Sequence, residues 1–366
     1  MIFTTLRSNY YVKEKPMKLT AQELYSESGK EGVILELKGN KDVSIENIAA
    51  FSNGQKGDLV FVPDEKAFKI AITGNCSAMV IDKKIAELAT QVDEETAVFI
   101  SANIALSHAI IKLKYQDHDY SQSGWDRIHP SAVIHATVTI PESTTIGPNV
   151  IIEKGVSIGE GCSIMANVVI EHNAVIGNNV RIHPSTTIGW DCVIGNDCLI
   201  LSNTVIGSEG FGYSQDQFFN HHRIPQTGNV VIGNKVTIGA TNTVDRGTYG
   251  PTTIGDGTIF DNICHTAHNV SIGKNCIILS GWLCAGSTTI GDRVVASGGA
   301  IIRDHITICD DVYLVHRAGV LFDIKEKGMY GGTPILKMAD YKENLKIAQN
   351  LKGLAKQIEE LKELNA

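Results

Sequence analysis

Isoleucine recurs at every sixth position along much of the chain. The register is unbroken over fourteen positions: Ile128, Ile134, Ile140, Ile146, Ile152, Ile158, Ile164, Ile170, Ile176, Ile182, Ile188, Ile194, Ile200 and Ile206. It returns at Ile232 and Ile238, shifts after Val244, and resumes at Ile254, Ile272, Ile278, Ile290, Ile302 and Ile308. A period of six is typical of a hexapeptide parallel β-helix, in which three short strands close one triangular coil. We therefore predict a stack of coils with the isoleucines inside.

The residues between the isoleucines suit the corners of such coils. Segments such as 177–179 (GNN) and 195–197 (GND) consist of glycine, asparagine and aspartate, the residues that best tolerate positive φ. Cys162, Cys192 and Cys198 occupy repeat positions where small apolar residues pack. We predict that they are reduced core thiols, because no metal-type or disulfide-type spacing is present.

The rest of the chain lacks this register. Residues 1–16 form an unpatterned extension, and residues 17–120 predict a small α/β domain. Within it, LTAQELYSES predicts a helix capped by Thr20, GVILELKG and GDLVFV predict strands, and NIALSHAIIKL predicts a second helix. The coil domain is expected over 125–335. In 336–366, a narrow apolar seam predicts a charged helix that forms a coiled coil between identical chains: Ile347, Leu351, Leu354, Ile358 and Leu361.

Charge and hydropathy exclude several classes of protein. Lysine plus arginine number 32 against 40 aspartates and glutamates, a formal net charge of −8. This balance argues against a generic nucleic-acid or anionic-membrane binder. The chain contains no apolar run long enough to span a membrane, and its first residues are charged where a signal peptide is apolar. We therefore expect a cytoplasmic protein.

Two excursions interrupt the repeat, and such excursions tend to have functional roles. Residues 207–231 are rich in glycine and aromatic residues, and a shorter excursion, DRGTYGP, begins at Asp245. The segment DNICHTAHNVSIG then brings together Asp261, His265 and His268. Because one coil spans eighteen residues, Gly286 is expected to stack on His268, and His305 follows two coils after it.

His268, Gly286 and His305 form a column that could hold an acyl thioester and its acceptor. An imidazole in this column could remove a proton from the acceptor near neutral pH. The backbone N–H of Gly286 is a candidate oxyanion donor. We expect His265 to be structural and His129, His135, His172 and His183 to be corner residues.

At this point the chain resembles the bacterial UDP-3-O-(3-hydroxyacyl)glucosamine N-acyltransferases of lipid A synthesis. The resemblance extends from about Met17 to the C-terminus and rests on an ordered set of motifs: GSEGFGY (207–213), IPQTGNVVIG (224–233), IGATNTVDRG (238–247), DNICHTAHNV (261–270), DHITICDDV (304–312) and YGGTP (330–334). It implies a left-handed parallel β-helix, a homotrimer with active sites between neighbouring coils, and no cofactor. The implied donor is a 3-hydroxyacyl group on acyl carrier protein, and the implied acceptor is a 3-O-acylated UDP-glucosamine.

The resemblance also implies roles for individual residues. His268 matches the catalytic base, Asp261 the carboxylate that supports it, and His305 a histidine beside the donor thioester. Asn262 belongs to the same motif and is a candidate substrate contact. In the N-terminal domain the family places uracil between two aromatic rings, here Phe61 and Phe68. Their spacing is one residue longer than in the family, and Asp64 or another residue stands where an asparagine is expected.

Three alternatives remain open on sequence. A γ-type carbonic anhydrase uses the same coil with three zinc-binding histidines, of which HTAH supplies only two. A paralogue acting on another nucleotide sugar would keep the coil and the base. O-acylation of UDP-N-acetylglucosamine is disfavoured, because the family that performs it lacks this N-terminal domain.

Overall fold

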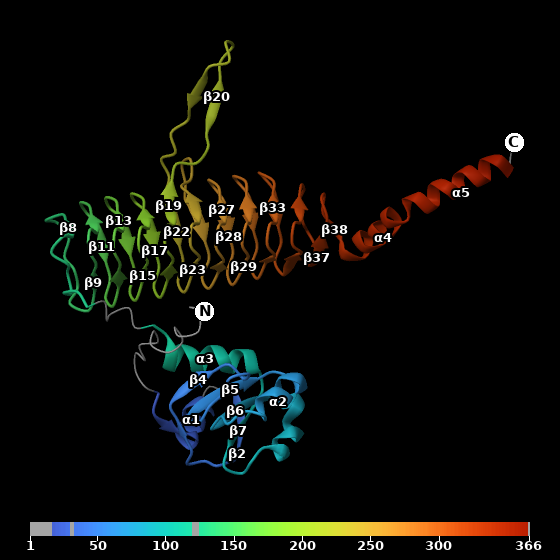
Figure 1. The fold of residues 1–366 in the computed structure, drawn as a ribbon. Coiled ribbons are helices and arrows are strands. Elements are labelled where there is room, and N and C mark those ends of the chain that lie inside the picture. The colour runs from blue at the N-terminus through green and yellow to red at the C-terminus, as the bar shows by residue number, and fades with distance from the viewer. Residues whose placement is uncertain (1–16, 30–32, 119–123, 365–366) are drawn as a thin grey trace, which may run out of the picture. The chain divides into compact units, whose positions relative to one another are not determined.

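The hexapeptide register folds into a three-sided prism of stacked coils (Figure 1). In this computed structural model the described residues are 17–29, 33–118 and 124–364, so the predicted extension over residues 1–16 lies outside them. The chain divides into two compact units, residues 1–120 and 121–366, and each is described by itself. The prism forms most of the second unit, and its strands are short, usually two residues each.

Each face of the prism is one sheet, and the chain passes from face 1 to face 2 to face 3 in every coil. Face 1 contains β8 (Val133–Ile134), β10 (Ile151–Ile152), β13 (Val169–Ile170), β16 (Thr187–Ile188), β19 (Val205–Ser208), β24 (Thr243–Asp245), β27 (His265–Thr266), β30 (Leu283–Cys284), β33 (Ile301–Ile302) and β36 (Gly319–Val320). Face 2 contains β11 (Ser157–Ile158), β14 (Val175–Ile176), β17 (Val193–Ile194), β22 (Val230–Ile232), β25 (Thr252–Ile254), β28 (Ser271–Ile272), β31 (Thr289–Ile290) and β34 (Thr307–Ile308). Face 3 contains β9 (Thr145–Ile146), β12 (Ser163–Ile164), β15 (Arg181–Ile182), β18 (Leu199–Ile200), β23 (Thr237–Ile238), β26 (Ile259–Phe260), β29 (Ile277–Ile278), β32 (Val295–Ala296), β35 (Val312–Leu314), β37 (Gly328–Gly331) and β38 (Leu336–Lys337).

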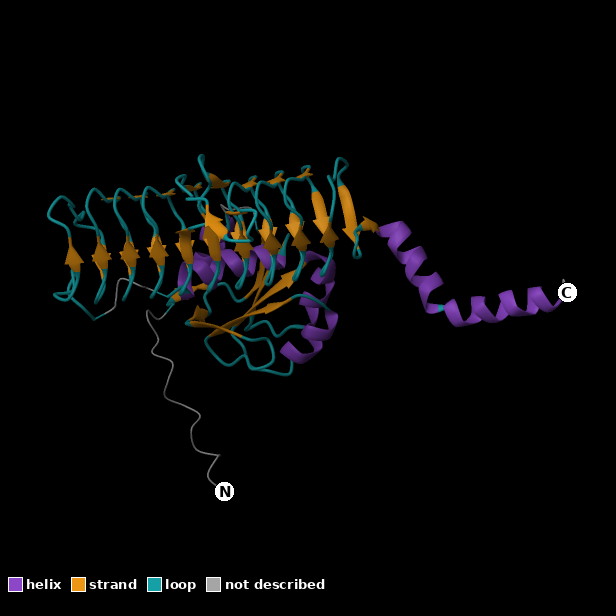
Figure 2. Cartoon of the chain, turned by 90° about the horizontal axis from the view of Figure 1, so that it is seen from above, coloured by secondary structure: helices purple, strands orange, loops and turns teal. Residues whose placement is uncertain are grey.

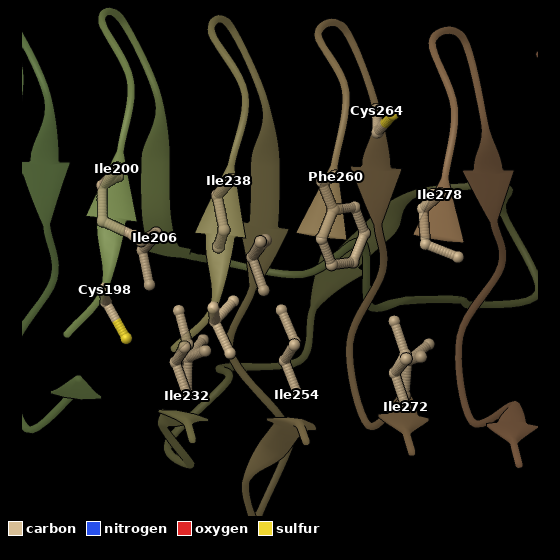
Figure 3. Close-up of a cluster of buried hydrophobic side chains, with 14 of the residues drawn as sticks. Cys198, Ile200, Ile206, Ile232, Ile238, Ile254, Phe260, Cys264, Ile272 and Ile278 are labelled. Carbon is tan, nitrogen blue, oxygen red and sulfur yellow. The ribbon is translucent and has the colours of Figure 1, made fainter. Parts of the chain in front are cut away.

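Parallel pairing fixes the eighteen-residue stacking that the sequence predicts. Ile152 pairs with Ile170, which pairs with Ile188, and all three side chains are buried inside the prism. Figure 3 shows further layers of the same core, in which Ile206 and Ile238 point inward together with Phe260. Burying such aliphatic side chains stabilises a fold by about 1.5–3 kcal/mol each. The layered isoleucines therefore account for the formation of the prism.

The corners also follow the sequence pattern. Asn179 and Asp197 have φ values of 56° and 57°. The Asn178 N–H donates to Asn196 Oδ1 over 2.8 Å, so an amide in one coil satisfies a corner N–H in the coil before it. All eight cysteines are unpaired, seven are buried and Cys309 is half-buried, which confirms the prediction of reduced thiols.

The excursion after β19 forms a hairpin that projects from the prism (Figure 1). Its strands β20 (Tyr213–Gln215) and β21 (His221–Arg223) pair antiparallel. The turn is organised by the Asp216 carboxylate, which accepts hydrogen bonds from the N–H groups of Phe218 and Asn220. The His222 side chain, followed by the Asn220 side chain and these N–H groups, lowers the pKa of Asp216 to about 2.

The N-terminal unit is an α/β domain, as the sequence predicts. Its five-stranded sheet has the order β2-β7-β6-β5-β4. The strands are β2 (Ile34–Gly39), β4 (Asn47–Ala49), β5 (Asp58–Val62), β6 (Ala78–Asp82) and β7 (Ala97–Ser101), and β1 (Leu19–Thr20) pairs separately with β3 (Ser44–Ile45). The helices are α1 (Ala21–Ser28), α2 (Glu65–Ala71), α3 (Ile104–Gln116) and the 3-10 helix η2 (Lys83–Gln91). Thr20 caps α1 through a capping box with Glu23, which confirms the predicted start of this helix.

The C-terminal segment differs from its prediction. Instead of one continuous helix, it forms α4 (Met338–Gln349) and α5 (Leu351–Leu364), which meet at a bend (Figure 2). Asn350 ends α4 with φ −101° and ψ 11°, outside the helical region, so the apolar seam is divided between two helices. Within the part of the chain that the structure describes, no helix is both long and apolar enough to cross a membrane.

Candidate active site

An open pocket of about 370 Å³ lies on face 1, where the hairpin leaves the prism. Strands β27, β30 and β33, with the residues that directly follow β27 and β30, supply most of its wall, and the hairpin excursion contributes Phe211. The lining residues are Phe211, Asp245, His265, Ala267, His268, Leu283, Cys284, Ala285, Gly286, Ile301 and Ile302. A mostly apolar pocket with a few polar groups at one side suits an acyl chain whose reactive end must be held in place.

His268 and Gly286 lie in successive coils at the corner between faces 1 and 2, as the eighteen-residue period predicts. The Ser287 N–H donates to the His268 carbonyl over 2.9 Å, which aligns the two coils. A Cβ on Gly286 would lie 2.5 Å from His268 Cε1, so only glycine leaves room for the ring in this position. Gly286 thus gives the imidazole its place in the pocket.

Replacing Gly286 by alanine is therefore expected to displace the ring. The added Cβ would lie 2.5 Å from Cε1 and 2.8 Å from Nε2, so the flexible side chain of His268 must turn away. A misplaced catalytic group commonly lowers kcat by about a hundredfold, and we expect a loss of this order with an unchanged melting temperature. Gly250→Ala is the matched control, because a Cβ there meets no atom within 4 Å. Equal turnover in the two variants would contradict this role of Gly286.

Asn269 holds the ring from the next position in the chain. Its Nδ2 lies 2.9 Å from His268 Nδ1. Its backbone has a φ of 58°, a conformation that asparagine tolerates better than most residues. Its Oδ1 accepts a hydrogen bond from the Thr248 N–H over 2.7 Å, which fixes the orientation of the amide. Apart from its place in the AHN motif, Asn269 has no feature in the sequence that singles it out.

Asp245 and His265 form a second polar pair in the pocket. Asp245 Oδ2 lies 3.7 Å from His265 Nε2, and Oδ1 accepts a hydrogen bond from Ser208 over 2.7 Å. Burial raises the pKa of Asp245, while the Ser208 bond and the nearby histidines act in the opposite direction. His265 Nδ1 is 2.7 Å from Thr243 Oγ1. The sequence predicted a structural His265, but the structure exposes it to the pocket.

A β-bulge in β19 turns Ser208 toward Asp245. The pairing of β19 with β24 shifts register between Ile206 and Ser208, so Ser208 pairs with Asp245. Bulges beside active sites commonly re-aim a side chain in this way. Asp245 is the first residue of the second excursion, and that break in the repeat was the only sequence signal for it.

Asp261 and Asn262 lie at a different corner, between faces 3 and 1. Asp261 accepts hydrogen bonds from the N–H groups of Asn262 and Ser280, and Asn262 Oδ1 accepts one from Ala240. Neither residue lines the pocket. Within one chain, therefore, Asp261 does not support His268 as the resemblance implied, and both side chains cap the corners of neighbouring coils.

His305 lies at the same corner as His268, two coils further along. The His305 N–H donates to the Gly286 carbonyl over 3.1 Å, which places it in the predicted column. Its Nδ1 is 2.9 Å from Asp304 Oδ2, and its side chain is largely exposed. His305 does not line the pocket itself.

Arg246 joins the two ends of the first excursion. Its guanidinium is buried and donates to the carbonyls of Gly207, Gly228 and Trp190 over 2.8, 3.0 and 3.0 Å. The same group lies 3.5 Å from the centre of the Trp190 ring, a cation–π contact. Because Gly207 and Gly228 lie at the two ends of the excursion, one side chain fixes where the hairpin leaves and rejoins the prism.

In the N-terminal domain, Phe61 and Phe68 pack on opposite faces of the sheet. Phe61 belongs to the core on one face and stacks on His108, with ring centres 4.4 Å apart. Phe68 belongs to the core on the other face, and both side chains are buried. These two rings therefore do not form the stacking sandwich that the resemblance implied.

The carbonic anhydrase alternative gains no support from the donor set. His265 and His268 both face the pocket, but no third histidine joins them there. Among the described residues, no three histidine, cysteine or acidic side chains are arranged to hold a metal ion.

Two comparisons with known proteins concern the repeat and the fold. Residues 128–212 match the family model of the GMPPB C-terminal domain. The crystal structure of an Arabidopsis UDP-N-acetylglucosamine acyltransferase shares the fold, with a TM-score of 0.50 and 24% identity over 56% of this chain and 71% of that chain. At that identity the likeness supports the left-handed parallel β-helix alone.

Two relatives match over nearly the whole chain. The UDP-3-O-acylglucosamine N-acyltransferase of Methylococcus capsulatus is 43% identical over 345 residues, which cover 94% of this chain and 97% of that protein. The enzyme of the same name from Coxiella burnetii is 33% identical over 90% of this chain and 94% of that protein. From this similarity and the matching fold, we conclude that the chain is an acyltransferase and belongs to the UDP-3-O-acylglucosamine N-acyltransferase family.

Proposed function

We propose that this protein transfers a 3-hydroxyacyl group from acyl carrier protein to the 2-amine of UDP-3-O-(3-hydroxyacyl)glucosamine, with His268 as the general base. The observation that supports this most directly is an imidazole stacked on a glycine in an apolar pocket, in a chain of this family. The names of the relatives support an N-acyl transfer to a UDP-sugar. We also propose that the protein acts in the cytoplasm.

The reaction needs no covalent enzyme intermediate. The neutral amine attacks the thioester carbonyl, a C–N bond forms, and the carbonyl oxygen becomes an oxyanion. The imidazole of His268 takes the proton that the nitrogen must lose, the C–S bond breaks, and the leaving thiolate receives a proton from the imidazolium. The described structure gives the Gly286 N–H no protein acceptor, so this group is available to the oxyanion. No cofactor is required beyond the phosphopantetheine of the carrier.

We also propose that the protein is a homotrimer, which the surface of the prism supports. In the C-terminal half, face 2 presents hydroxyl side chains to solvent, namely Thr253, Ser271, Thr289 and Thr307. Faces 3 and 1, by contrast, expose large apolar side chains: Ile259, Ile277, Leu283 and Ile301, with Ile263 at the corner between them. Contiguous apolar surface on two faces is typical of an interface between subunits. Exposed Ile347, Leu351, Ile358 and Leu361 give the C-terminal helices a seam for the same association.

The proposed reaction can be tested by mass spectrometry of the product. Purified full-length protein should receive a mixture of 3-hydroxyacyl carriers together with UDP-3-O-acylglucosamine and competing nucleotide sugars. We expect one product whose mass increases by one 3-hydroxyacyl group, and whose fragments place that group on the amine. Acylation of a hydroxyl, or of another nucleotide sugar in preference, would contradict the proposal and favour the paralogue alternative.

A further inference from the structure

A chain of hydrogen bonds connects both excursions to the ring of His268. It begins at Gln226, which is only 2% exposed and lies where the hairpin rejoins the prism. The Thr248 hydroxyl, in the second excursion, donates to Gln226 Oε1 over 2.8 Å. Gln226 Nε2 donates to the Ile224 carbonyl over 3.0 Å. Both ends of the Gln226 amide are therefore held by hydrogen bonds, and the Thr248 hydroxyl donates its hydrogen to Gln226 Oε1.

Thr248 in turn fixes the amide of Asn269. The Thr248 N–H donates to Asn269 Oδ1 over 2.7 Å, and Asn269 Nδ2 donates to Thr248 Oγ1 over 3.0 Å. A backbone N–H can only donate, so the oxygen of the Asn269 amide must face it. The NH₂ end then faces the ring, 2.9 Å from His268 Nδ1.

This arrangement determines which ring nitrogen bears hydrogen. An amide NH₂ can only donate, so Nδ1 of His268 is the acceptor in this bond. In a neutral imidazole the hydrogen then lies on Nε2. The backbone N–H of Thr248 alone determines which atom of the Asn269 amide is the oxygen, so the tautomer of His268 follows from that N–H.

We propose that Gln226, Thr248 and Asn269 are positioning residues that fix both the orientation and the tautomer of His268 before substrate binds. The inference rests on the proposed role of His268 as base. The lone pair that a base needs is then that of Nδ1, which Asn269 holds in the free enzyme. Proton transfer requires the substrate amine to displace the Asn269 NH₂ group from Nδ1. Until then, the relay keeps the ring and this lone pair in the position that the amine must meet.

The relay also assigns a function to the excursions themselves. Gln226 belongs to the IPQTG motif and Thr248 follows the DRG motif, and neither side chain lines the pocket. The regular coils place the His268 ring at the corner. Through Asn269, the two excursions determine the orientation and the tautomer of that ring. A purely structural role would affect folding and leave the tautomer unchanged.

The tautomer can be read directly from the ring nitrogens. Full-length protein labelled with ¹⁵N-histidine should be measured by NMR at a pH where the rings are neutral, with His268 assigned by its loss in His268→Ala. We expect a protonated Nε2 and a bare Nδ1. Asn269→Asp replaces the NH₂ donor by an acceptor oxygen and should move the hydrogen to Nδ1. A hydrogen on Nδ1 in the unmodified protein, or the same tautomer in both proteins, would overturn the proposal.

Kinetics test the outer part of the relay. Thr248→Val removes the hydroxyl between Gln226 and Asn269 and should lower kcat about tenfold to a hundredfold, with little change in KM. Thr248→Ser should restore kcat. Thr253→Val is the matched control, since the Thr253 hydroxyl donates to Ser271 Oγ over 2.9 Å on face 2, away from the pocket.

The two proposals fail in different ways. If Thr248→Val and Thr253→Val have the same kcat, the relay does not position the base. Normal turnover in His268→Ala would instead remove the base itself, and the proposed function with it. The NMR measurement needs no turnover, so it distinguishes an absent relay from an absent catalytic role.

Discussion

Replacing His268 by alanine is expected to lower kcat by about 10²–10⁴-fold, the contribution usually made by a positioned general base. Without an imidazole at this corner, no group stacked on Gly286 can take the proton from the attacking amine. Because the ring lies in an open pocket outside the isoleucine core, assembly and carrier binding should be largely unchanged. Steady-state acyl transfer, measured beside the oligomeric state of the variant, tests both expectations.

A second histidine at the same corner provides the control. His135 lies at the corner after β8, where its Nδ1 contacts Thr137 Oγ1 over 3.0 Å. His135→Ala removes a ring at the equivalent corner of the first coil, several coils before those that line the pocket, and should leave kcat unchanged. Near-normal turnover in His268→Ala would refute the role of His268 as the base.

Replacing Arg246 by methionine should lower the free energy of unfolding of the prism by roughly 3 kcal/mol or more. The substitution keeps an apolar stem of similar length but leaves the carbonyls of Gly207, Gly228 and Trp190 without their donor. Each buried acceptor without a partner is destabilising by about 1–3 kcal/mol. Urea unfolding followed by circular dichroism measures the loss. Faster proteolysis within the hairpin would show that its ends had been released.

Arg293 is the matched control for this experiment. It contacts the carboxylates of Asp310 and Asp311 at the corner between faces 2 and 3, with half of its side chain exposed. Exposed ion pairs usually contribute about 1 kcal/mol or less, so Arg293→Met should have little effect on unfolding. If the two variants unfold at the same urea concentration, the buried guanidinium is not the clamp that its hydrogen bonds indicate.

The sequence predicted the parts of this protein that follow from an unbroken register. The isoleucine period determines the prism, its inner layers and its corners, because each residue's place in a coil depends only on its position modulo eighteen. For the same reason, the stacking of Gly286 on His268 could be derived from their spacing alone. Segments of the α/β domain were also predictable, since local capping and strand patterns determine them.

Sequence proximity was a poor guide where the repeat itself turns. Asp261 precedes His268 by seven residues, but six residues in this fold lead from one corner to the next. The two residues therefore lie at different corners of the prism. Asp245 is further away along the chain, yet it lines the same pocket as His268, because one coil and one insertion separate them.

Side-chain direction was decided by the tertiary structure. Phe61 and Phe68 are close in sequence, but alternate residues of β5 face opposite sides of the sheet, and α2 covers the side that Phe61 does not face. The bulge at Ser208 and Asp245 likewise arises only when β19 and β24 pair across an excursion.

By itself, then, the sequence determined the repeating scaffold, the family motifs and the corner at which the imidazole lies. Only the folded chain decided which groups lie beside that imidazole, namely Asn269, which contacts its Nδ1, and Asp245, which lines the same pocket. The physical reason is that a periodic register specifies geometry only while it is uninterrupted. The two insertions break the register beside the pocket, and their path depends on hydrogen bonds between residues distant in sequence.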